Sequence, residues 1–213
     1  MLFNLSEHNS IANQFLKEVR SFEIQKDRMR FRRNMERLGE IMAYEVSKKL
    51  SYTVEEVNTI LGTTTVSVPE TPVLITILRA GIPFFQGVLN FFDQATCGFV
   101  GAFRREHKQE VTIMSDYISL PQIKNKTVIL IDPMLATGRS IAHTVNNLMK
   151  AGSPSHIHIL SMIAAPEGLA YLADTLKISY SLWTCAVDEK LDTQFYIVPG
   201  LGDAGDLSFG DKI

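Results

Sequence analysis

Residues 128–141, VILIDPMLATGRSI, place one acid and several small or hydroxylated residues directly after an apolar run. Asp132 can accept hydrogen bonds from the hydroxyl groups of a polyol. The turn that follows leads into a helical pattern, and a helix start favours a phosphate because its N–H groups lack partners and carry partial positive charge. Gly138 allows close approach of the backbone, and Thr137 and Ser140 add hydroxyl donors. These residues together suit a phosphorylated sugar.

A plainer interpretation of the same residues stays open at this point. Asp132 can be an ordinary turn acid, and Ser140 can simply cap the helix that follows. The Gly-Lys-Ser/Thr ending of a Walker phosphate loop is absent, so that class of nucleotide site is not indicated.

Two arginines follow other apolar runs. Arg79 and Gly81 come directly after the apolar run 73–78. The forked guanidinium donors of Arg79 suit a diphosphate, and Gly81 allows the ligand to approach the backbone closely. Arg104 comes after 97–103, whereas its neighbour Arg105 must point elsewhere and is assigned to solvent. Each motif alone is weak, because an exposed arginine in a tight loop explains it equally well.

Predicted strands and helices alternate along the chain, and these elements must position the residues described above. Apolar runs at 73–78, 97–103, 127–132, 156–165 and 178–187 predict strands, and helices are predicted from Pro83 and over 140–150 and 167–175. Extended chain is expected at 111–121. This order predicts an α/β fold with a mostly parallel central sheet flanked by helices. Ligands of such sheets bind beyond the carboxyl ends of the strands, where the motifs fall.

The first sixty residues read as a mainly helical N-terminal segment. Apolar residues three and four apart predict helices over 15–22 and 30–50. Thr53, followed three residues later by Glu56, resembles a capping box and predicts a further short helix.

The bulk composition fits a single domain over 1–213. Its 213 residues are 46% hydrophobic with a formal net charge of −2, which gives no general reason to expect nucleic acid or a membrane as partner. No apolar run approaches the roughly 20 residues of a membrane helix, and no signal peptide is recognisable. Cys97 and Cys185 show no metal-ligand spacing and are expected to be reduced and buried, as in a cytoplasmic protein.

The motifs together resemble a known family. VILIDPMLATGRS resembles the phosphoribosyl diphosphate (PRPP) loop of type I phosphoribosyltransferases, and its Asp-Pro pair resembles the uracil branch. The segment 196–210, YIVPGLGDAGDLSFG, resembles the uracil-binding segment of that branch. These motifs and LRAG (78–81) stand in family order within 35–213, although Leu207-Ser208 departs from the usual basic residue.

The resemblance implies a set of site residues. It places PRPP on Arg79, Arg104, Asp132, Pro133, Met134, Leu135, Ala136, Thr137, Gly138, Arg139, Ser140 and Asp203. It places uracil on Ile197, Gly202, Asp203 and Ala204, within a base-recognition loop at 190–213. Arg79, Arg104 and Asp132 would act by charge stabilisation and positioning, without a covalent nucleophile. Mg²⁺ would be held by PRPP and water, with Asp203 as a candidate to bind one of those waters.

Arg139 stands where the family usually has glycine. If the backbone at 139 needs a positive φ, arginine is strained there. If it does not, the side chain points to solvent or adds a cation near the phosphate.

Two other segments have expected roles. Residues 106–121 are a candidate flap that closes over the substrate and excludes water. Residues 17–37 hold eight basic and four acidic side chains, which form either a solvated helix face, a subunit contact or a regulatory nucleotide site. The resemblance to the family implies GTP as that nucleotide. The resemblance implies a homodimer or higher homo-oligomer. Alternative functions are transfer to another base, or a PRPP-sensing regulator that binds RNA.

Overall fold

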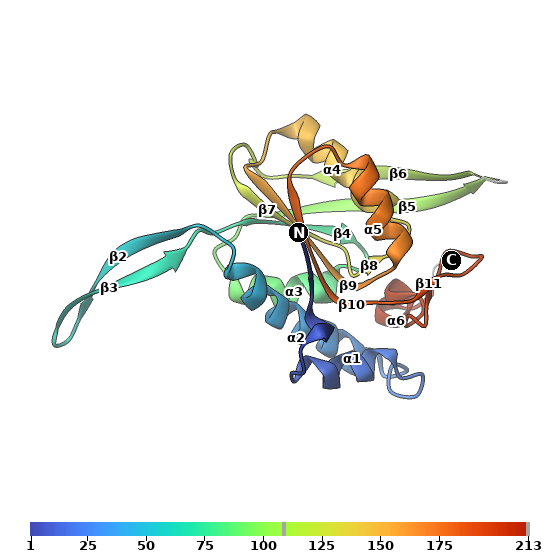
Figure 1. Cartoon of the computed structure of the whole chain (residues 1–213), viewed down its shortest axis with the longest axis horizontal. Helices are drawn as coiled ribbons and strands as arrows, with labels where there is room; N and C mark the ends of the chain where they lie inside the picture. Colours follow the sequence, from blue (N-terminus) through green and yellow to red (C-terminus); the bar gives the residue numbers. More distant parts are fainter. Residues whose placement is uncertain (108–109, 212–213) are drawn as a thin grey trace.

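A computed structural model describes the backbone of residues 1–107 and 110–211, and the side chains of these residues apart from 102–116. The sheet strands are β1 (Leu2–Asn4), β4 (Val73–Leu78), β5 (Cys97–His107), β6 (Glu110–Ser119), β7 (Thr127–Ile131), β8 (Met134–Leu135), β9 (His156–Ala164) and β10 (Tyr180–Val187). Within the described residues they form one eight-stranded sheet in the order β1-β10-β9-β7-β4-β5-β6, with β8 paired to β9 (Figure 1). Only β5 and β6 pair antiparallel, so the predicted mostly parallel sheet is confirmed.

Helices cover both faces of this sheet. One face carries α1 (Ala12–Arg20), α2 (Arg28–Ser47) and α3 (Ile82–Phe91), and the other carries α4 (Arg139–Ala151) and α5 (Pro166–Thr175) (Figure 1). Successive side chains of a strand point to opposite faces. Accordingly Ile129 packs under the first group of helices, and Leu130 packs under the second. The central strands β4 and β7 are therefore buried and largely apolar, which made them recognisable in the sequence.

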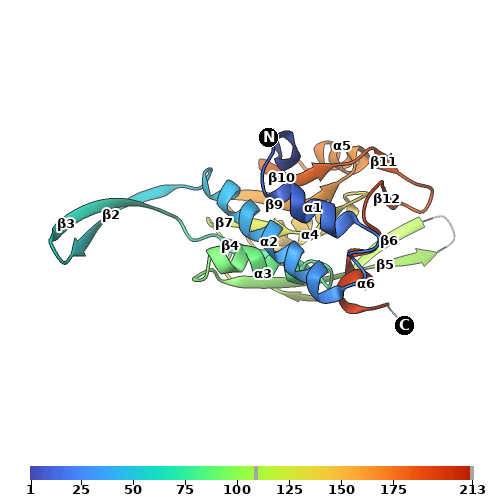
Figure 2. The same ribbon diagram turned by 90° about the horizontal axis from the view of Figure 1, so that it is seen from below.

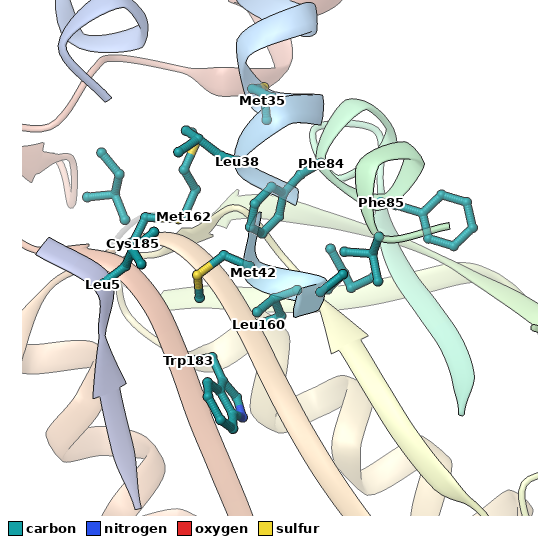
Figure 3. Close-up of a cluster of buried hydrophobic side chains, with 14 of the residues drawn as sticks. Leu5, Met35, Leu38, Met42, Phe84, Phe85, Leu160, Met162, Trp183 and Cys185 are labelled. Atoms are coloured by element: carbon teal, nitrogen blue, oxygen red, sulfur yellow. The ribbon is translucent and has the colours of Figure 1, made fainter. Parts of the chain in front are cut away.

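The core under α2 is built from large apolar side chains (Figure 3). Met35, Leu38 and Met42 lie one helical turn apart along one face of α2 and are fully buried. They meet Phe84 of α3 and the sheet residue Leu160 in the same cluster. Met35 and Met42 are therefore packing residues, whereas Met29 near the start of the same helix is exposed.

The region after residue 50 differs from its predicted structure. It forms a hairpin of β2 (Tyr52–Thr59) and β3 (Gly62–Pro69), which pair only with each other within the described residues. The short helix predicted from Thr53 and Glu56 is wrong, and the first sixty residues are only partly helical. Figures 1 and 2 show the hairpin projecting away from the sheet and its helices.

The C-terminal part returns to the carboxyl edge of the sheet. After β10 come β11 (Lys190–Leu191), β12 (Ile197–Val198) and the short helix α6 (Ala204–Phe209), and a 3₁₀ turn, η1 (Leu5–Glu7), follows β1. Both cysteines are free. Cys185 is buried as predicted, whereas Cys97 is partly exposed. None of the described helices is long and apolar enough to cross a membrane.

A buried histidine makes stability depend on pH. His158 accepts a hydrogen bond from the Trp183 indole N–H (3.0 Å), and burial together with the neighbouring His156 lowers its pKa to about 4. Between pH 6.5 and 4 the unfolded chain binds a proton that the folded protein excludes. We therefore expect the free energy of unfolding to fall by about 3 kcal/mol as the pH drops through this range. Urea unfolding at pH 7, 5.5 and 4.5 measures this fall in the free energy of unfolding.

His158→Gln is the matched variant for this measurement, because its amide oxygen can still accept from Trp183 but does not titrate. The difference in stability between the two proteins should shrink as the pH falls from 6.5 to 4. A difference that stays constant over this range would show that His158 is not the responsible group.

Candidate active site

Asp132 lies directly after β7, at the carboxyl edge of the sheet. Its backbone N–H donates to the Leu160 carbonyl (3.0 Å), and its carboxylate accepts from the Met134 N–H (3.3 Å). The side chain is largely buried yet lines a narrow hollow at the sheet edge. The same hollow is lined by Met134, Leu135, Ala136, Thr137, Gly138, Ser140 and Ile141. The structure thus gathers most of the residues predicted to bind PRPP around one depression.

The turn after β8 depends on a glycine. Gly138 adopts φ +75 and stands at the N-cap of α4, where it has no side chain to cap the helix, and the Arg139 N–H donates to the Thr137 hydroxyl oxygen at 3.5 Å. The helix begins at Arg139, one residue earlier than expected, so the interpretation of Ser140 as a simple N-cap is wrong. A turn of this kind leaves N–H groups at the helix start for a ligand.

Gly138→Ala is expected to destabilise the fold. The left-handed conformation costs an alanine roughly 1–2 kcal/mol, and its Cβ would lie 2.9 Å from the Gly168 carbonyl oxygen. The melting temperature should fall by roughly 3 to 8 °C, as calorimetry would measure. Gly62→Ala in the hairpin is the matched control, because no atom lies within 4 Å of its added Cβ. Equal melting temperatures for the two variants would contradict the prediction.

The two alternatives for Arg139 are resolved by this geometry. Gly138 takes the positive φ, and Arg139 is the first helical residue of α4, exposed on the surface. Among described residues other than glycine, only Asn125 and Phe195 have a positive φ. The arginine therefore replaces the usual glycine of the family without backbone strain.

The loop after β4 lies next to β7. Thr76 of β4 pairs in register with Ile131, and its hydroxyl donates to the Ile131 carbonyl (3.3 Å). Gly81 is packed so closely against Thr76 that a Cβ would overlap the threonine hydroxyl. This contact holds the loop that carries Arg79 beside the strand that leads to Asp132.

The Arg79 side chain reaches the C-terminal segment. Its Nη2 donates to Asp206 (2.6 Å) and to the Gly210 carbonyl (2.8 Å). Its Nε is buried and has no hydrogen-bond partner among the described atoms. A buried donor without a partner costs about 1–3 kcal/mol, and an anion bound beside it would remove that cost.

The predicted uracil residues form a tight turn before α6. Gly200 and Gly202 have φ +58 and +97, and a Cβ on Gly200 would overlap the Ile197 carbonyl oxygen. Asp203 caps α6 by accepting from the N–H groups of residues 205 (2.8 Å) and 206 (3.0 Å). The side chains of Ile197 and Ala204 are buried in the core. Any contact of these two residues with a base would therefore come from the backbone.

A second hollow of about 370 Å³ borders this segment. The connection between α1 and α2 contributes Gln25 and Lys26 to its lining, and the first residue of α2 contributes Arg28. The C-terminal segment contributes Leu201, Gly202, Asp203, Asp206, Leu207 and Asp211. Since Asp206 also holds Arg79, the hollow and the β4 loop are neighbours.

Two expectations fall on residues whose side chains the structure does not describe. Arg104 lies on β5 opposite Ile113, and its side chain is among those left out. The candidate flap, 106–121, largely coincides with β6, and residues 108–109 lie outside the description. Both assignments stay predictions.

Sequence reasoning missed three residues that shape the site. Gly168 at the start of α5 lies so close to the Ala136 carbonyl that no Cβ would fit. Asp206 holds Arg79, as described above. Asp188 follows β10, is buried, and accepts from the Gly200 N–H (2.8 Å). Asp188 could have been found, because it repeats the pattern of an acid directly after a buried strand that drew attention to Asp132.

Comparisons with known proteins agree with this geometry. The family model for uracil phosphoribosyltransferase matches residues 6–211. A uracil phosphoribosyltransferase of Porphyromonas gingivalis is 45% identical over 214 residues, covering 100% of this chain and 99% of that protein. One of Methanothermobacter thermautotrophicus is 37% identical, with 95% and 93% covered. The solved structure of the AQ2163 protein from Aquifex aeolicus has a TM-score of 0.89 at 31% identity, with both chains fully covered. The chain belongs to the uracil phosphoribosyltransferase family.

Proposed function

We propose that the protein transfers the phosphoribosyl group of PRPP to N1 of uracil, giving UMP and pyrophosphate in pyrimidine salvage. The observation that carries this proposal is the C-terminal segment. It contains the glycine turn and the capped α6, and its Asp206 is bound to Arg79 of the β4 loop (2.6 Å). A base held by this segment and a diphosphate held by the β4 loop would therefore be adjacent.

The proposed chemistry needs positioning and charge stabilisation, with no nucleophile from the protein. Asp132 would hold the ribose through its hydroxyl groups. The turn at 136–140 would bind the 5′-phosphate at the start of α4. Arg79 and Arg104 would stabilise the diphosphate as the bond from C1 of the ribose to it breaks, ahead of attack by N1. The buried, unpartnered Nε of Arg79 supports this assignment.

Selection of the base would come from main-chain groups. Uracil presents an N3–H donor between two carbonyl acceptors, and a glycine turn can offer C=O and N–H groups in complement. Cytosine has an acceptor at N3 and an amino group at C4, so the same backbone would leave buried groups without partners. Such mismatches discriminate strongly between substrates.

Mg²⁺ fits this scheme as an ion bound chiefly by the substrate. Among the described residues, no group of three His, Cys, Asp or Glu side chains is arranged to hold a metal. We assign most ligands to PRPP oxygens and water, which Mg²⁺ retains readily, and one such water to the Asp203 carboxylate. When bound, the ion would neutralise charge on the diphosphate.

The test is a base panel. Purified protein is mixed with PRPP, Mg²⁺ and radiolabelled uracil, with cytosine, hypoxanthine and xanthine in parallel reactions. UMP formed from uracil alone is the expected result. Product from hypoxanthine or xanthine would show that the protein acts on a purine base instead of uracil. PRPP binding without product from any base would favour the PRPP-sensing regulator.

The alternative of an RNA-binding regulator depends on the basic segment 17–37. Several of its cations have partners within the chain: Arg20 binds Asp188, Arg30 binds Glu18, and Arg33 binds Glu36. The segment is therefore less available for phosphates than its composition indicates. A GTP effector at this segment remains part of the proposal, and adding GTP to the uracil reaction tests it through the rate of UMP formation. The cytoplasmic location stays a prediction.

A homo-oligomer is proposed as the working form, with the β2–β3 hairpin as its contact. Ile60 and Leu61 at the tip are fully exposed, and Val54 and Val66 are also exposed. An apolar hairpin that pairs with no other strand is a typical association surface. We expect a double substitution of Ile60→Asp and Leu61→Asp to shift the protein to monomers in light scattering. Thr175→Asp, at an exposed position of α5 outside the hairpin, should leave the assembly unchanged. An unchanged mass for both variants would exclude the hairpin as the contact.

A further inference from the structure

The backbone N–H and C=O of Gly200 are both bound by one ion pair. Asp188 Oδ2 accepts from the Gly200 N–H (2.8 Å), and Arg20 Nη1 donates to the Gly200 carbonyl (3.0 Å). The two side chains also bind each other through both guanidinium Nη atoms, at 2.8 and 2.5 Å. Arg20 and Asp188, which lie 168 residues apart in the sequence, therefore form a clamp on the two peptide groups that flank the Gly200 Cα.

Gly200 itself has little means of fixing this orientation. It has no side chain to pack, and its left-handed φ of +58 lies in a region that glycine enters freely. The next residues, 201–204, contain the glycine and backbone groups assigned to base recognition. The direction of that backbone is therefore set by whatever holds residue 200.

The rest of the N-terminal helical segment supports the same loop. When the Gln25 side-chain amide is oriented so that its nitrogen faces acceptors, that nitrogen donates a hydrogen bond to the Leu201 carbonyl (3.1 Å). Arg32 on α2 donates to the Ser208 carbonyl (2.7 Å). Donors from the N-terminal helices thus bind three main-chain carbonyls of the C-terminal segment.

Burial distinguishes the clamp from a surface ion pair. The Asp188 side chain is 5% exposed and that of Arg20 is 25% exposed. A buried ion pair adds little net stability compared with apolar packing, but removing one partner leaves an unpaired buried charge. Its main effect here is geometric, because its hydrogen bonds end on the main chain of the base-recognition segment.

We propose that Arg20 and Asp188 are positioning residues for base recognition, which set the backbone at Gly200 so that the backbone of 201–204 faces uracil. This inference rests on the proposed function. Among the described residues, neither side chain has a hydrogen bond to Arg79 or to the 132–140 segment. Asp203, the one residue of 201–204 that is also assigned to PRPP, is held by its own bonds to the N–H groups of residues 205 and 206. Loss of the clamp should therefore affect uracil and leave PRPP binding unchanged.

The test compares Arg20→Met with Arg30→Met. Each variant removes an arginine of the N-terminal helical segment, and each of these arginines pairs with a buried carboxylate. The difference is that the partner of Arg30 is Glu18, which has no hydrogen bond to the C-terminal segment among the described residues. In Arg20→Met we expect the uracil KM to rise between about 10-fold and 100-fold, since a small misplacement of a positioning group has effects of this size. The PRPP Kd, from calorimetric titration without uracil, should stay within about twofold, and Arg30→Met should keep the wild-type uracil KM.

Two further variants keep the proposal testable if Arg20→Met does not fold. Asp188→Asn retains an acceptor for the Gly200 N–H, and Arg20→Lys retains the charge but loses the forked geometry. Both should show a smaller rise in the uracil KM, again with an unchanged PRPP Kd.

Three results would overturn the proposal. These are a uracil KM that is unchanged in every folded clamp variant, an equal rise in Arg30→Met, and a parallel loss of PRPP affinity. Failure of the unmodified protein to form UMP is a separate result: it would refute the proposed function itself, and with it the role in uracil recognition.

Discussion

Asp132→Asn is expected to weaken PRPP binding by roughly 100-fold while the protein stays folded. In the proposed complex the carboxylate accepts hydrogen bonds from the ribose hydroxyls, and bonds to a charged acceptor contribute about 1.5–3 kcal/mol each. The amide keeps the shape of the side chain and one acceptor, so the internal bond from the Met134 N–H can persist. Calorimetric titration with PRPP and Mg²⁺ measures the change.

The matched control is Asp174→Asn, the same chemical change at an exposed position of α5. It should bind PRPP as the wild type does. Near-equal PRPP affinities for Asp132→Asn and wild type would remove Asp132 from the ribose site, and the acid would then be a structural residue of the turn.

Arg79→Met is expected to lower kcat by roughly 100-fold to 1,000-fold, because it removes a cation from the departing diphosphate. The methionine fills similar space along the side-chain stem but provides no donors. The variant also loses the bonds to Asp206 and Gly210, which tie the β4 loop to the C-terminal segment. Steady-state kinetics at saturating PRPP and uracil give kcat, and product inhibition by pyrophosphate gives the affinity for the leaving group.

Asp206→Asn distinguishes the loss of the cation beside the diphosphate from the loss of the bonds to the C-terminal segment. It weakens the tether to Arg79 but leaves the guanidinium in place, so kcat should fall far less than in Arg79→Met. If both variants lose activity equally, the arginine acts by holding the C-terminal segment, and its role as a diphosphate ligand would be wrong.

The central strands could be predicted from the sequence because burial on both faces leaves a simple pattern. The predicted strand at 73–78 coincides with β4, and the apolar part of 127–132 coincides with β7. Both have five or more successive buried residues, which helices on either side require. The edge strand β1 was missed, because three residues are too short to show a period.

The hairpin could not be predicted in the same way. Every residue of β2 is exposed, so neither the helical nor the strand period appears in its apolar residues. The capping pattern at Thr53 and Glu56 was then the strongest local signal, and it was misleading. The run of threonines and valines at 63–68 carried the correct information, since β-branched residues favour strands.

The motifs of the candidate site were recognisable in the sequence, but the connections between them were not. Asp132 and the turn at 136–140 are adjacent in the chain, and their placement follows from one strand end. The contacts of Arg79 with Asp206, and of Arg20 with Asp188, join residues 127 and 168 positions apart. Only the folded arrangement of strand ends and N-terminal helices brings such pairs together.

The clamp on Gly200 has a consequence for how the protein is synthesised. Bonds from Arg20 and Arg32 to the C-terminal segment span 180 and 176 residues. On the ribosome the N-terminal helices emerge first and must wait for nearly the whole chain before they meet these partners. Contacts of such long range form slowly. The central strands β4 and β7 can therefore pair long before these bonds form, whereas the base-recognition segment gains its bonds from the N-terminal helices only after residues 200–208 have left the exit tunnel.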